Sequence, residues 1–424
     1  RYLSKTDLPD EQIADLFLAG RFPDWIEEKL RGYLGQVTYP LAIRSSSLLE
    51  DAQFRAYAGL YRTYMITNDC PDAKQRLKHL IHAIKLVYAS TYYRGPKAFS
   101  KRVGHRTEEE QMAVIIQRLV GSSYGDRFYP AISGVAQSHN YYPFARMKPE
   151  EGIVTIAMGL GKTVVEGEKT LRFSPAHPQL LPQRSTVEDI LDNAQRHFYA
   201  LKMEKSCHYL ETNDGANLWH REVTEAENEL PMQFLASTYV PDEHRIRDTV
   251  HIPGQRVLTI AHILKYREFP LADILKDMLE LGEQGMGCPV EMEFSVNLTA
   301  EPDHPPQFAF LQLRPMTARA ELEQVNISAE EIENAFCFSG KALGNALKQD
   351  MADIILVKPE AFDPGRTMEI AREISRINAS LVKEDRKYLL VGPGRWGSAD
   401  RWLGIPVAWA DISGVGAMIE TDSD

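Results

Sequence analysis

The first ninety residues carry hydrophobic patterns of two kinds. Apolar side chains recur at helical spacing over residues 10–34, where one proline interrupts them, and again over residues 72–88. Between these segments, residues 40–43 have the continuous apolar character of a short buried strand. We therefore expect two helical regions and a strand, and the strand should deliver Arg44 and the hydroxyls of residues 45–47 to its C-terminal edge.

The middle of the chain changes to strand-like patterns. Residues 112–120, 131–138 and 153–158 are rich in β-branched and apolar side chains and are separated by turns that contain Gly and Tyr. These three segments predict one antiparallel sheet. Farther along, the pattern predicts helices over residues 189–201 and over residues 257–281, the latter interrupted by a proline.

After about residue 321 the pattern predicts a separate, smaller α/β module. A strand is expected at residues 354–357, a helix at 367–381 and a second strand at 388–391. The whole chain is thus expected to be α+β, with an α/β module at its C-terminal end.

Two strands bring polar side chains together. Residues 290–297 alternate strictly, so Glu291 and Glu293 point to one face while the apolar residues point to the other. Residues 308–316 form a second candidate strand, and three larger side chains are expected to share one of its faces: Phe310, Gln312 and Arg314. If the strands pair, carboxylates, an amide and a guanidinium line one surface, and such a surface suits Mg²⁺ that bridges phosphate oxygens.

Each of these features has a plainer alternative. The hairpin can be half-buried with an ordinary solvated face on which Glu and Arg pair weakly. Arg44, at the edge of a strand and followed by three hydroxyls, is equipped to hold a phosphate. It can equally make a strand-end ion pair with Glu50 or Asp51.

Residues 159–163 (Gly-Leu-Gly-Lys-Thr) suggest a P-loop, but they fail its pattern. The motif requires a glycine where this chain has Ile156, so the phosphate cradle of a P-loop is not encoded. Lys162 can still contact a phosphate, and a surface lysine after a glycine turn is the plainer alternative.

Composition narrows the class of protein. The 424 residues predict about two or three domains, and 44% hydrophobic and 25% charged residues are typical of soluble globular proteins. The net charge of −11 argues against a nucleic-acid partner, and no apolar run approaches the length of a membrane span. We expect a cytoplasmic protein with no membrane contact, whose four cysteines are reduced because none forms a CxxC pair.

Seven motifs occur in an order that resembles a known family. They are residues 40–51, 58–59, 112–120, 133–136, 159–167, 291–294 and 311–315. Together they resemble the nucleotide-binding domain of phosphoenolpyruvate synthase (pyruvate, water dikinase) and pyruvate phosphate dikinase over about residues 8–320. The resemblance implies an ATP-grasp fold, in which two α+β subdomains (residues 1–110 and 111–320) clamp ATP, followed by the module of residues 321–424.

The resemblance also implies roles for individual residues. Arg44 and Arg314 are similar to the family arginines that contact the phosphates, and Glu293 and Gln312 to the ligands of Mg²⁺-ATP. Glu291, beside Glu293, is also implied to contact the nucleotide, at a position where the family often has aspartate. The adenine hinge is implied to include Gln117, Leu119 and Val120, and the segments over the phosphates Gly134, Gly159, Gly161 and Lys162. In the related enzymes a histidine on a swivelling domain carries the phosphoryl group from ATP to pyruvate.

Some family features are absent. The family's Gly-Gly-Lys motif has no equivalent upstream of Arg44, so we expect that an N-terminal portion precedes Arg1. No histidine has the Thr-Ser-His setting of the carrier; Ala399 stands where it is expected if the last module is a modified swivelling domain. The loop of residues 392–397 can instead bind an anion through backbone N–H groups and Arg395.

The leading hypothesis is therefore an ATP- and magnesium-binding phosphotransferase unit that depends on further domains of the same polypeptide for catalysis. Its partners would be ATP and a small acceptor such as pyruvate. The alternatives from other classes are a non-catalytic nucleotide-sensing module and an ATP-grasp carboxylate ligase.

Overall fold

The computed structural model divides the chain into two compact units, Arg1–Arg319 and Ala320–Asp424. The first unit mixes helices with several small sheets, which confirms the expected α+β class. The structure describes residues 8–47, 61–97, 111–141, 143, 147–181, 186–203, 213–298, 305–316, 327–339, 347–384, 386–398 and 404–421. The motif at residues 58–59, the acidic residues Glu50 and Asp51, and Ala399 lie outside these ranges.

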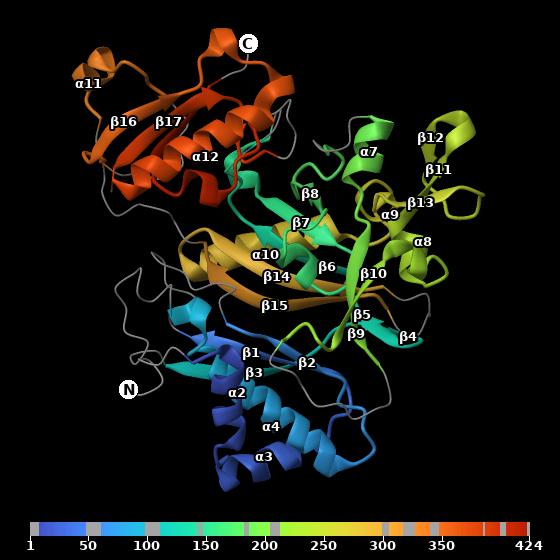
Figure 1. The fold of residues 1–424 in the computed structure, drawn as a ribbon. Coiled ribbons are helices and arrows are strands. Elements are labelled where there is room, and N and C mark those ends of the chain that lie inside the picture. The colour runs from blue at the N-terminus through green and yellow to red at the C-terminus, as the bar shows by residue number, and fades with distance from the viewer. Residues whose placement is uncertain are drawn as a thin grey trace. The chain divides into compact units, whose positions relative to one another are not determined.

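The first unit begins with helices packed on a three-stranded sheet of order β2-β1-β3 (Figure 1). Helix α4 contacts all three strands, and Asp72 caps its N-terminus by accepting a hydrogen bond from the Lys74 N–H at 2.8 Å. The elements are α2 (Asp10–Ala19), α3 (Asp24–Leu34), β1 (Leu41–Ser47), β2 (Tyr64–Ile66), α4 (Ala73–Ser90) and β3 (Met112–Arg118). Their buried side chains form a core of their own, so this part of the unit is packed independently.

Strand β3 corrects two sequence-based expectations. It pairs with β1 over seven residues, from Leu41↔Arg118 to Ser47↔Met112, and not with the strands that follow it in the chain. The prediction that residues 112–120, 131–138 and 153–158 form one antiparallel sheet is therefore wrong for the first segment, whereas the strands Ile132–Gln137 and Ile153–Ala157 do pair antiparallel as expected. The long pairing also extends β1 through residues 45–47, so Arg44 lies in the middle of the strand and not at its C-terminal edge.

A five-stranded antiparallel sheet of order β15-β14-β6-β7-β8 forms the centre of the unit's second part. Helix α10 packs against β14 and β6, and its Gly282 lies close to Val290 and Leu313 of the sheet. The elements are β6 (Ile132–Gln137), β7 (Ile153–Ala157), β8 (Leu171–Phe173), α10 (Leu271–Met286), β14 (Val290–Asn297) and β15 (Gln307–Pro315). One face of this sheet is thus committed to the core, and the opposite face bears the polar side chains of the hairpin.

Gly134 in β6 gives a stability prediction. A Cβ at this position would lie 2.5 Å from Phe294 Cζ and 2.8 Å from Ile156 Cγ2. Gly134→Ala should therefore lower the free energy of unfolding by about 1–3 kcal/mol through overpacking. Gly285→Ala, in helix α10 with no atom within 4 Å of the added Cβ, should raise it by about 0.5–1 kcal/mol. Chemical denaturation measures both changes, and equal effects in the two variants would contradict the packing argument.

The second part of the unit also contains two smaller sheets. Their orders are β10-β9-β5-β4 and β12-β11-β13. Their strands are β4 (Ser122–Tyr124), β5 (Arg127–Tyr129), β9 (His197–Lys202), β10 (Leu218–Glu222), β11 (Ala236–Val240), β12 (Arg245–Arg247) and β13 (Gln255–Leu258). A short helix, α9 (Ala261–Leu264), lies between β13 and α10 in the chain.

The helix predicted over residues 189–201 is wrong in its second half. Helix α7 covers Val187–Asn193, and the chain then enters strand β9. Gln195, which is buried, accepts a hydrogen bond from the Met158 N–H at 2.8 Å and donates to the Met158 and His197 carbonyls. These bonds satisfy the backbone where the helix stops, so tertiary contacts override the local helical pattern.

The second unit is a parallel α/β module. Strands β16 (Met351–Leu356), β17 (Lys387–Pro393) and β20 (Val415–Thr421) form one sheet in which each neighbouring pair is parallel. Helix α12 (Thr367–Lys383) connects β16 to β17, and its Ala371 and Ile374 are buried in the core of the module. In the described parts of both units, no helix has the length and apolar character needed to cross a membrane.

The cysteines differ from the expectation that all four are reduced. Cys70 is disulfide-bonded, so the prediction is wrong for this residue. Cys288 and Cys337 are free thiols, as expected. The CxxC rule failed at Cys70 because it tests only spacing along the chain, whereas a disulfide depends on distance in space.

Candidate functional site

The hairpin of β14 and β15 places its polar side chains as the alternation predicted. The two strands are antiparallel, with Glu291 opposite Arg314 and Glu293 opposite Gln312. Residues directly opposite each other in such a pair share a face, so all four side chains lie on the polar side of the sheet. Val290, Met292 and Phe294 are buried on the other side.

One irregularity corrects the predicted face of β15. The register shifts between Glu293 and Phe294, so Phe294 lies opposite Phe310 and Leu311 is the extra residue of a β-bulge. The bulge moves Phe310 to the face of Phe294, away from Gln312 and Arg314. The expectation that Phe310 shares the polar face is therefore wrong.

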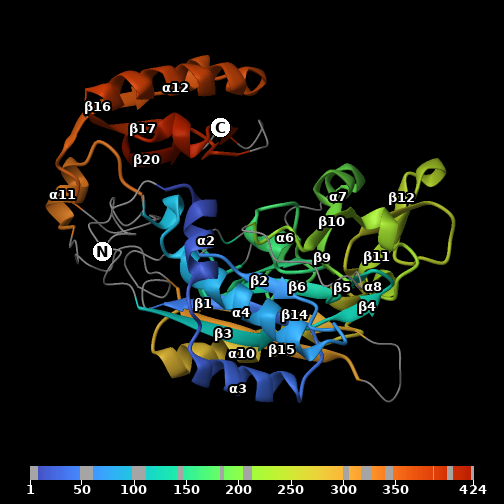
Figure 2. The ribbon, with the colours of Figure 1, turned by 60° about the horizontal axis from the view of Figure 1, so that its bottom comes forward.

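Arg44 joins the first sheet to this hairpin. Its Nη2 atom donates to Glu293 Oε2 at 3.0 Å and also donates to Gln312 Oε1. The side chains of Arg44 and Glu293 are only 19% and 25% exposed, so this ion pair is largely shielded from solvent. In both ribbon views β1 lies close to β15, although the two strands belong to different sheets (Figures 1 and 2).

The other carboxylate of the hairpin, that of Glu291, is hydrogen-bonded to Arg314 and Gln137. Arg314 Nε donates to Glu291 Oε1 at 2.7 Å, and Arg314 Nη2 forms a further hydrogen bond with the same oxygen. Gln137 of β6 donates to Glu291 Oε2 at 2.6 Å. The sequence reasoning missed Gln137, although the register of β6 on β14 places it directly opposite Glu291.

The predicted adenine hinge lies where the chain passes between sheets. Strand β3 ends at Arg118 in the first sheet, and β4 begins at Ser122 in another. Leu119 donates its N–H to the Pro40 carbonyl at 2.9 Å, and Val120 follows, half-buried. The Gln117 amide donates to the carbonyl of the bulge residue Leu311 at 3.1 Å, which holds β3 beside β15.

The glycines predicted over the phosphates lie in two places. Gly134 is in the middle of β6, packed under Phe294. Gly159 has a φ of +91°, and a Cβ there would lie 2.7 Å from the Tyr199 carbonyl oxygen. Close packing thus explains both of these glycines, and their contacts with phosphate stay predictions. Gly161 precedes the short helix α6 (Lys162–Val165) and has more space, because a Cβ would meet only Ser133 at 3.9 Å.

Lys162 belongs to a small charged network. Its Nζ lies 3.1 Å from Glu166 Oε1 and 5.8 Å from the centre of the Tyr199 ring. The Tyr199 hydroxyl donates to Glu166 Oε2 at 2.5 Å. Burial acts to raise the pKa of Glu166, but the hydrogen bonds from Tyr199 and Lys162 outweigh it and hold that pKa below its ordinary value. Glu166 therefore stays ionised beside the glycine segment, and the phosphate contact of Lys162 stays a prediction.

The loop after β17 uses its N–H groups internally. Gly394 donates to the Thr421 carbonyl at 2.9 Å, Trp396 to Glu420 Oε1 at 3.0 Å and Gly397 to the Ile405 carbonyl at 2.8 Å. These three N–H groups already donate to acceptors within the protein. The interpretation that they form an anion-binding site is therefore wrong.

The polar face of the hairpin fits a hard cation and a phosphate chain. Its oxygen donors are the carboxylates of Glu291 and Glu293 and the amide oxygen of Gln312, which are the ligands that Mg²⁺ prefers. Arg44 and Arg314 bring two permanent positive charges to the same face. Since guanidinium groups bind carboxylate and phosphate through the same geometry, both arginines are suited to hold phosphate oxygens.

Comparison with known proteins decides the family. Residues 4–335 match the family described as pyruvate phosphate dikinase, AMP/ATP-binding domain. The chain belongs to this family. Membership implies nucleotide binding and an ATP-grasp-like fold for the first unit, and the match extends slightly beyond the end of that unit.

Part of the chain is also similar to a curated protein. Over 175 residues the chain is 26% identical to "uncharacterized phosphotransferase YvkC" of Bacillus subtilis (strain 168). The aligned region is 40% of this chain and 19% of the relative, so the chain spans only a small part of that protein's length.

Proposed function

We propose that the chain binds ATP with magnesium on the polar face of the β14–β15 hairpin, as the nucleotide-binding unit of a phosphoenolpyruvate synthase-like phosphotransferase. The observation that carries this proposal is the contact of Arg44, from one sheet, with Glu293 and Gln312 of another. It supports an ATP-grasp arrangement in which two subdomains close on a nucleotide. Residues 117–120, at the end of β3 and the start of the connection to β4, would contact adenine.

Each group on this face has a proposed part in binding. Glu293 and Gln312 would hold Mg²⁺, with Glu291 beside them, and the cation would neutralise charge on the phosphates. Arg44 would turn from Glu293 to a phosphate oxygen when the ligand arrives, because the cation would then take over that carboxylate. Arg314 would contact a second phosphate while Gln137 continues to hold Glu291. Phosphoryl transfer requires mainly such positioning and charge neutralisation.

The proposal also includes a phosphoryl acceptor. The family resemblance makes pyruvate a candidate, reached through a carrier histidine. The chain has no Thr-Ser-His sequence among its 12 histidines. The carrier would therefore come from a further domain of the same polypeptide, as the short coverage of the curated relative allows.

Two measurements test the proposal. Calorimetric titration of the chain with Mg·ATP should show one saturable site, and absence of binding would overturn it. Incubation with β- and γ-labelled ATP then tests the transferase part. This incubation uses the full-length polypeptide, which would supply the carrier domain. Label that reaches a protein or small-molecule acceptor supports phosphotransfer, label that stays on intact ATP indicates a sensing module, and ADP release that requires a carboxylate and an amine indicates a ligase.

A further inference from the structure

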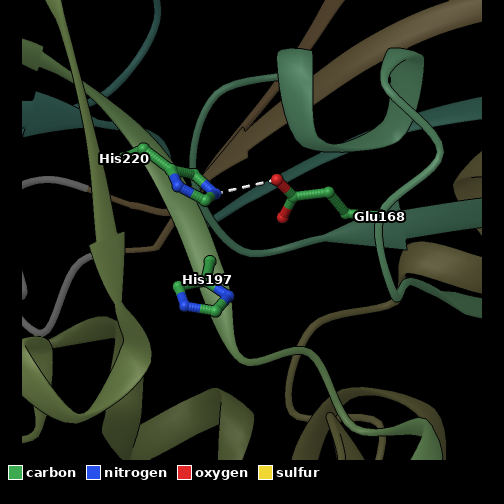
Figure 3. Close-up of side chains that lie close together, drawn as sticks. All are labelled: Glu168, His197 and His220. Carbon is green, nitrogen blue, oxygen red and sulfur yellow. Dashed lines mark hydrogen bonds and ion pairs between the residues drawn. The ribbon is translucent and has the colours of Figure 1, made fainter.

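Away from the hairpin, two histidines and a glutamate converge on one small volume. The ligand atoms of Glu168, His197 and His220 all lie within 4.8 Å of one another. His220 Nε2 is 2.8 Å from Glu168 Oε1, and the rings of His197 and His220 are stacked with centroids 4.9 Å apart. In Figure 3 the Glu168 carboxylate points toward the His220 ring, and the ring of His197 lies beside them.

Separate parts of the fold supply these three side chains. His197 begins β9 and His220 is in the middle of β10, which pairs with β9 so that His220 lies opposite Tyr199. Side chains two residues apart on a strand share a face, so both histidines project from the same side of this ribbon. Glu168 comes from the segment between α6 and β8.

The surroundings hold the histidines in place. Buried Gln195 donates to the His197 carbonyl at 2.8 Å, and the Tyr199 ring packs against the His220 ring with centroids 4.7 Å apart. Tyr199 is itself fixed by its hydrogen bond to Glu166. The His220 side chain is 43% exposed and that of Glu168 24%, so the cluster is supported from within and open to solvent on one side. A cation has a path into it.

We propose that Glu168, His197 and His220 form a binding site for a transition-metal cation, with Zn²⁺ as the preferred ion. Two imidazoles and one carboxylate form a donor set that zinc accepts, with a fourth position left for water. Tetrahedral bonds of about 2.0–2.2 Å place neighbouring ligand atoms about 3.3–3.6 Å apart. The three donor atoms lie within 4.8 Å of one another, so rotation of the side chains, including the stacked imidazole rings, would bring them to this spacing, and the cation would replace the hydrogen bond between His220 and Glu168.

This site differs in chemistry from the proposed nucleotide site. The hairpin offers carboxylate and amide oxygens, which suit magnesium, whereas imidazole nitrogens favour zinc and its neighbours among the transition metals. The cation would tie the segment after α6 to the β9–β10 ribbon, on which Leu160 already rests through its N–H bond to the Tyr199 carbonyl at 2.9 Å. It would thus stiffen the attachment of the Gly159–Lys162 segment to β9.

Calorimetric titration of the metal-free chain with ZnCl₂, without nucleotide, tests the proposal. The background should carry Cys288→Ser and Cys337→Ser, because free thiols bind zinc on their own. We expect one equivalent of Zn²⁺ to bind, and His197→Ala or His220→Ala to weaken binding by more than about 100-fold, since loss of a group that only supports a ligand already costs about 10- to 100-fold. Zn²⁺ should also raise the melting temperature of the parent chain and not of these variants.

The controls separate this site from others. His244→Ala removes a histidine that pairs with Glu188 at the same distance of 2.8 Å, with no third metal ligand beside it among the residues that the structure describes, and this variant should bind Zn²⁺ like the parent. Glu293→Gln should also bind Zn²⁺ normally, so that failure of the nucleotide proposal leaves this one standing. Glu168→Gln, a nearly isosteric change, provides a variant that is expected to fold. Unchanged Zn²⁺ affinity in Glu168→Gln and in both histidine variants would overturn the proposal.

Discussion

Arg44→Ala should weaken the binding of Mg·ATP by about 10- to 100-fold. Arg44 is the charged side chain of the first sheet that contacts Glu293 and Gln312 of the hairpin, and on ligand binding it would donate charged hydrogen bonds to a phosphate. Such bonds contribute about 1.5–3 kcal/mol each, and every 1.4 kcal/mol corresponds to a factor of ten in affinity. Calorimetric titration at fixed Mg²⁺ concentration measures the loss.

Two further arginine variants make the Arg44 result interpretable. Arg44→Lys keeps the charge but loses the planar group that contacts Glu293 and Gln312 together, so its affinity should fall between those of the parent and Arg44→Ala. Arg31→Ala removes an arginine that pairs with Glu27 on the exposed surface of α3, and it should bind Mg·ATP normally. Equal affinity in Arg44→Ala and Arg31→Ala would exclude Arg44 from the nucleotide site.

The hairpin could be predicted from the sequence because its signal is local. Strict alternation over residues 290–297 fixes which side chains share a face, and burial of Val290, Met292 and Phe294 confirms that face. Helices α2, α3 and α4 likewise lie within the predicted helical segments, or within two residues of them, because their apolar stripes have the period of a helix. The apolar period of a segment depends only on that segment, so these elements and their buried faces can be predicted without knowing what packs against them.

The errors discussed next depend on how strands pair, which the pattern of a single segment does not encode. Strand β3 pairs with β1 across some seventy residues, which no local pattern encodes. The bulge at Leu311 inserts one residue into an otherwise regular alternation and so exchanges the face of Phe310. The metal cluster was missed because β9 was taken for the end of a helix, and His197 and His220 share a face only when β9 and β10 pair.

The site itself combines a local and a non-local component. Glu291, Glu293, Gln312 and Arg314 come together through one hairpin, whereas Arg44 and Gln137 reach it from two other strands. In the absence of ligand each carboxylate is paired with a guanidinium, which limits the cost of holding two negative charges so close together. Ligand binding would exchange these partners for a cation and phosphates, so the electrostatic balance of this face is kept in both states.

This exchange predicts a result for Glu293→Gln that depends on the metal. The substitution keeps the shape of the side chain and its ability to accept from Arg44, but it removes the negative charge that would hold Mg²⁺. In the presence of Mg²⁺, the affinity for ATP should fall by about 10- to 100-fold, as is common when the support of a bound metal is lost. Without Mg²⁺, the affinity should be unchanged or higher, because one carboxylate no longer repels the phosphates.

Paired titrations with Mg²⁺ and with EDTA separate this effect from a general loss of structure. A misfolded variant would lose affinity under both conditions, whereas loss of a metal ligand affects only the first. Glu243→Gln is the matched control, because Glu243 pairs with Arg247 on an exposed 3₁₀ turn far along the chain from the hairpin. If Glu293→Gln retained the full Mg²⁺-dependent gain in affinity, the cation would have to bind elsewhere, and the role proposed for the Glu293–Gln312 pair would be wrong.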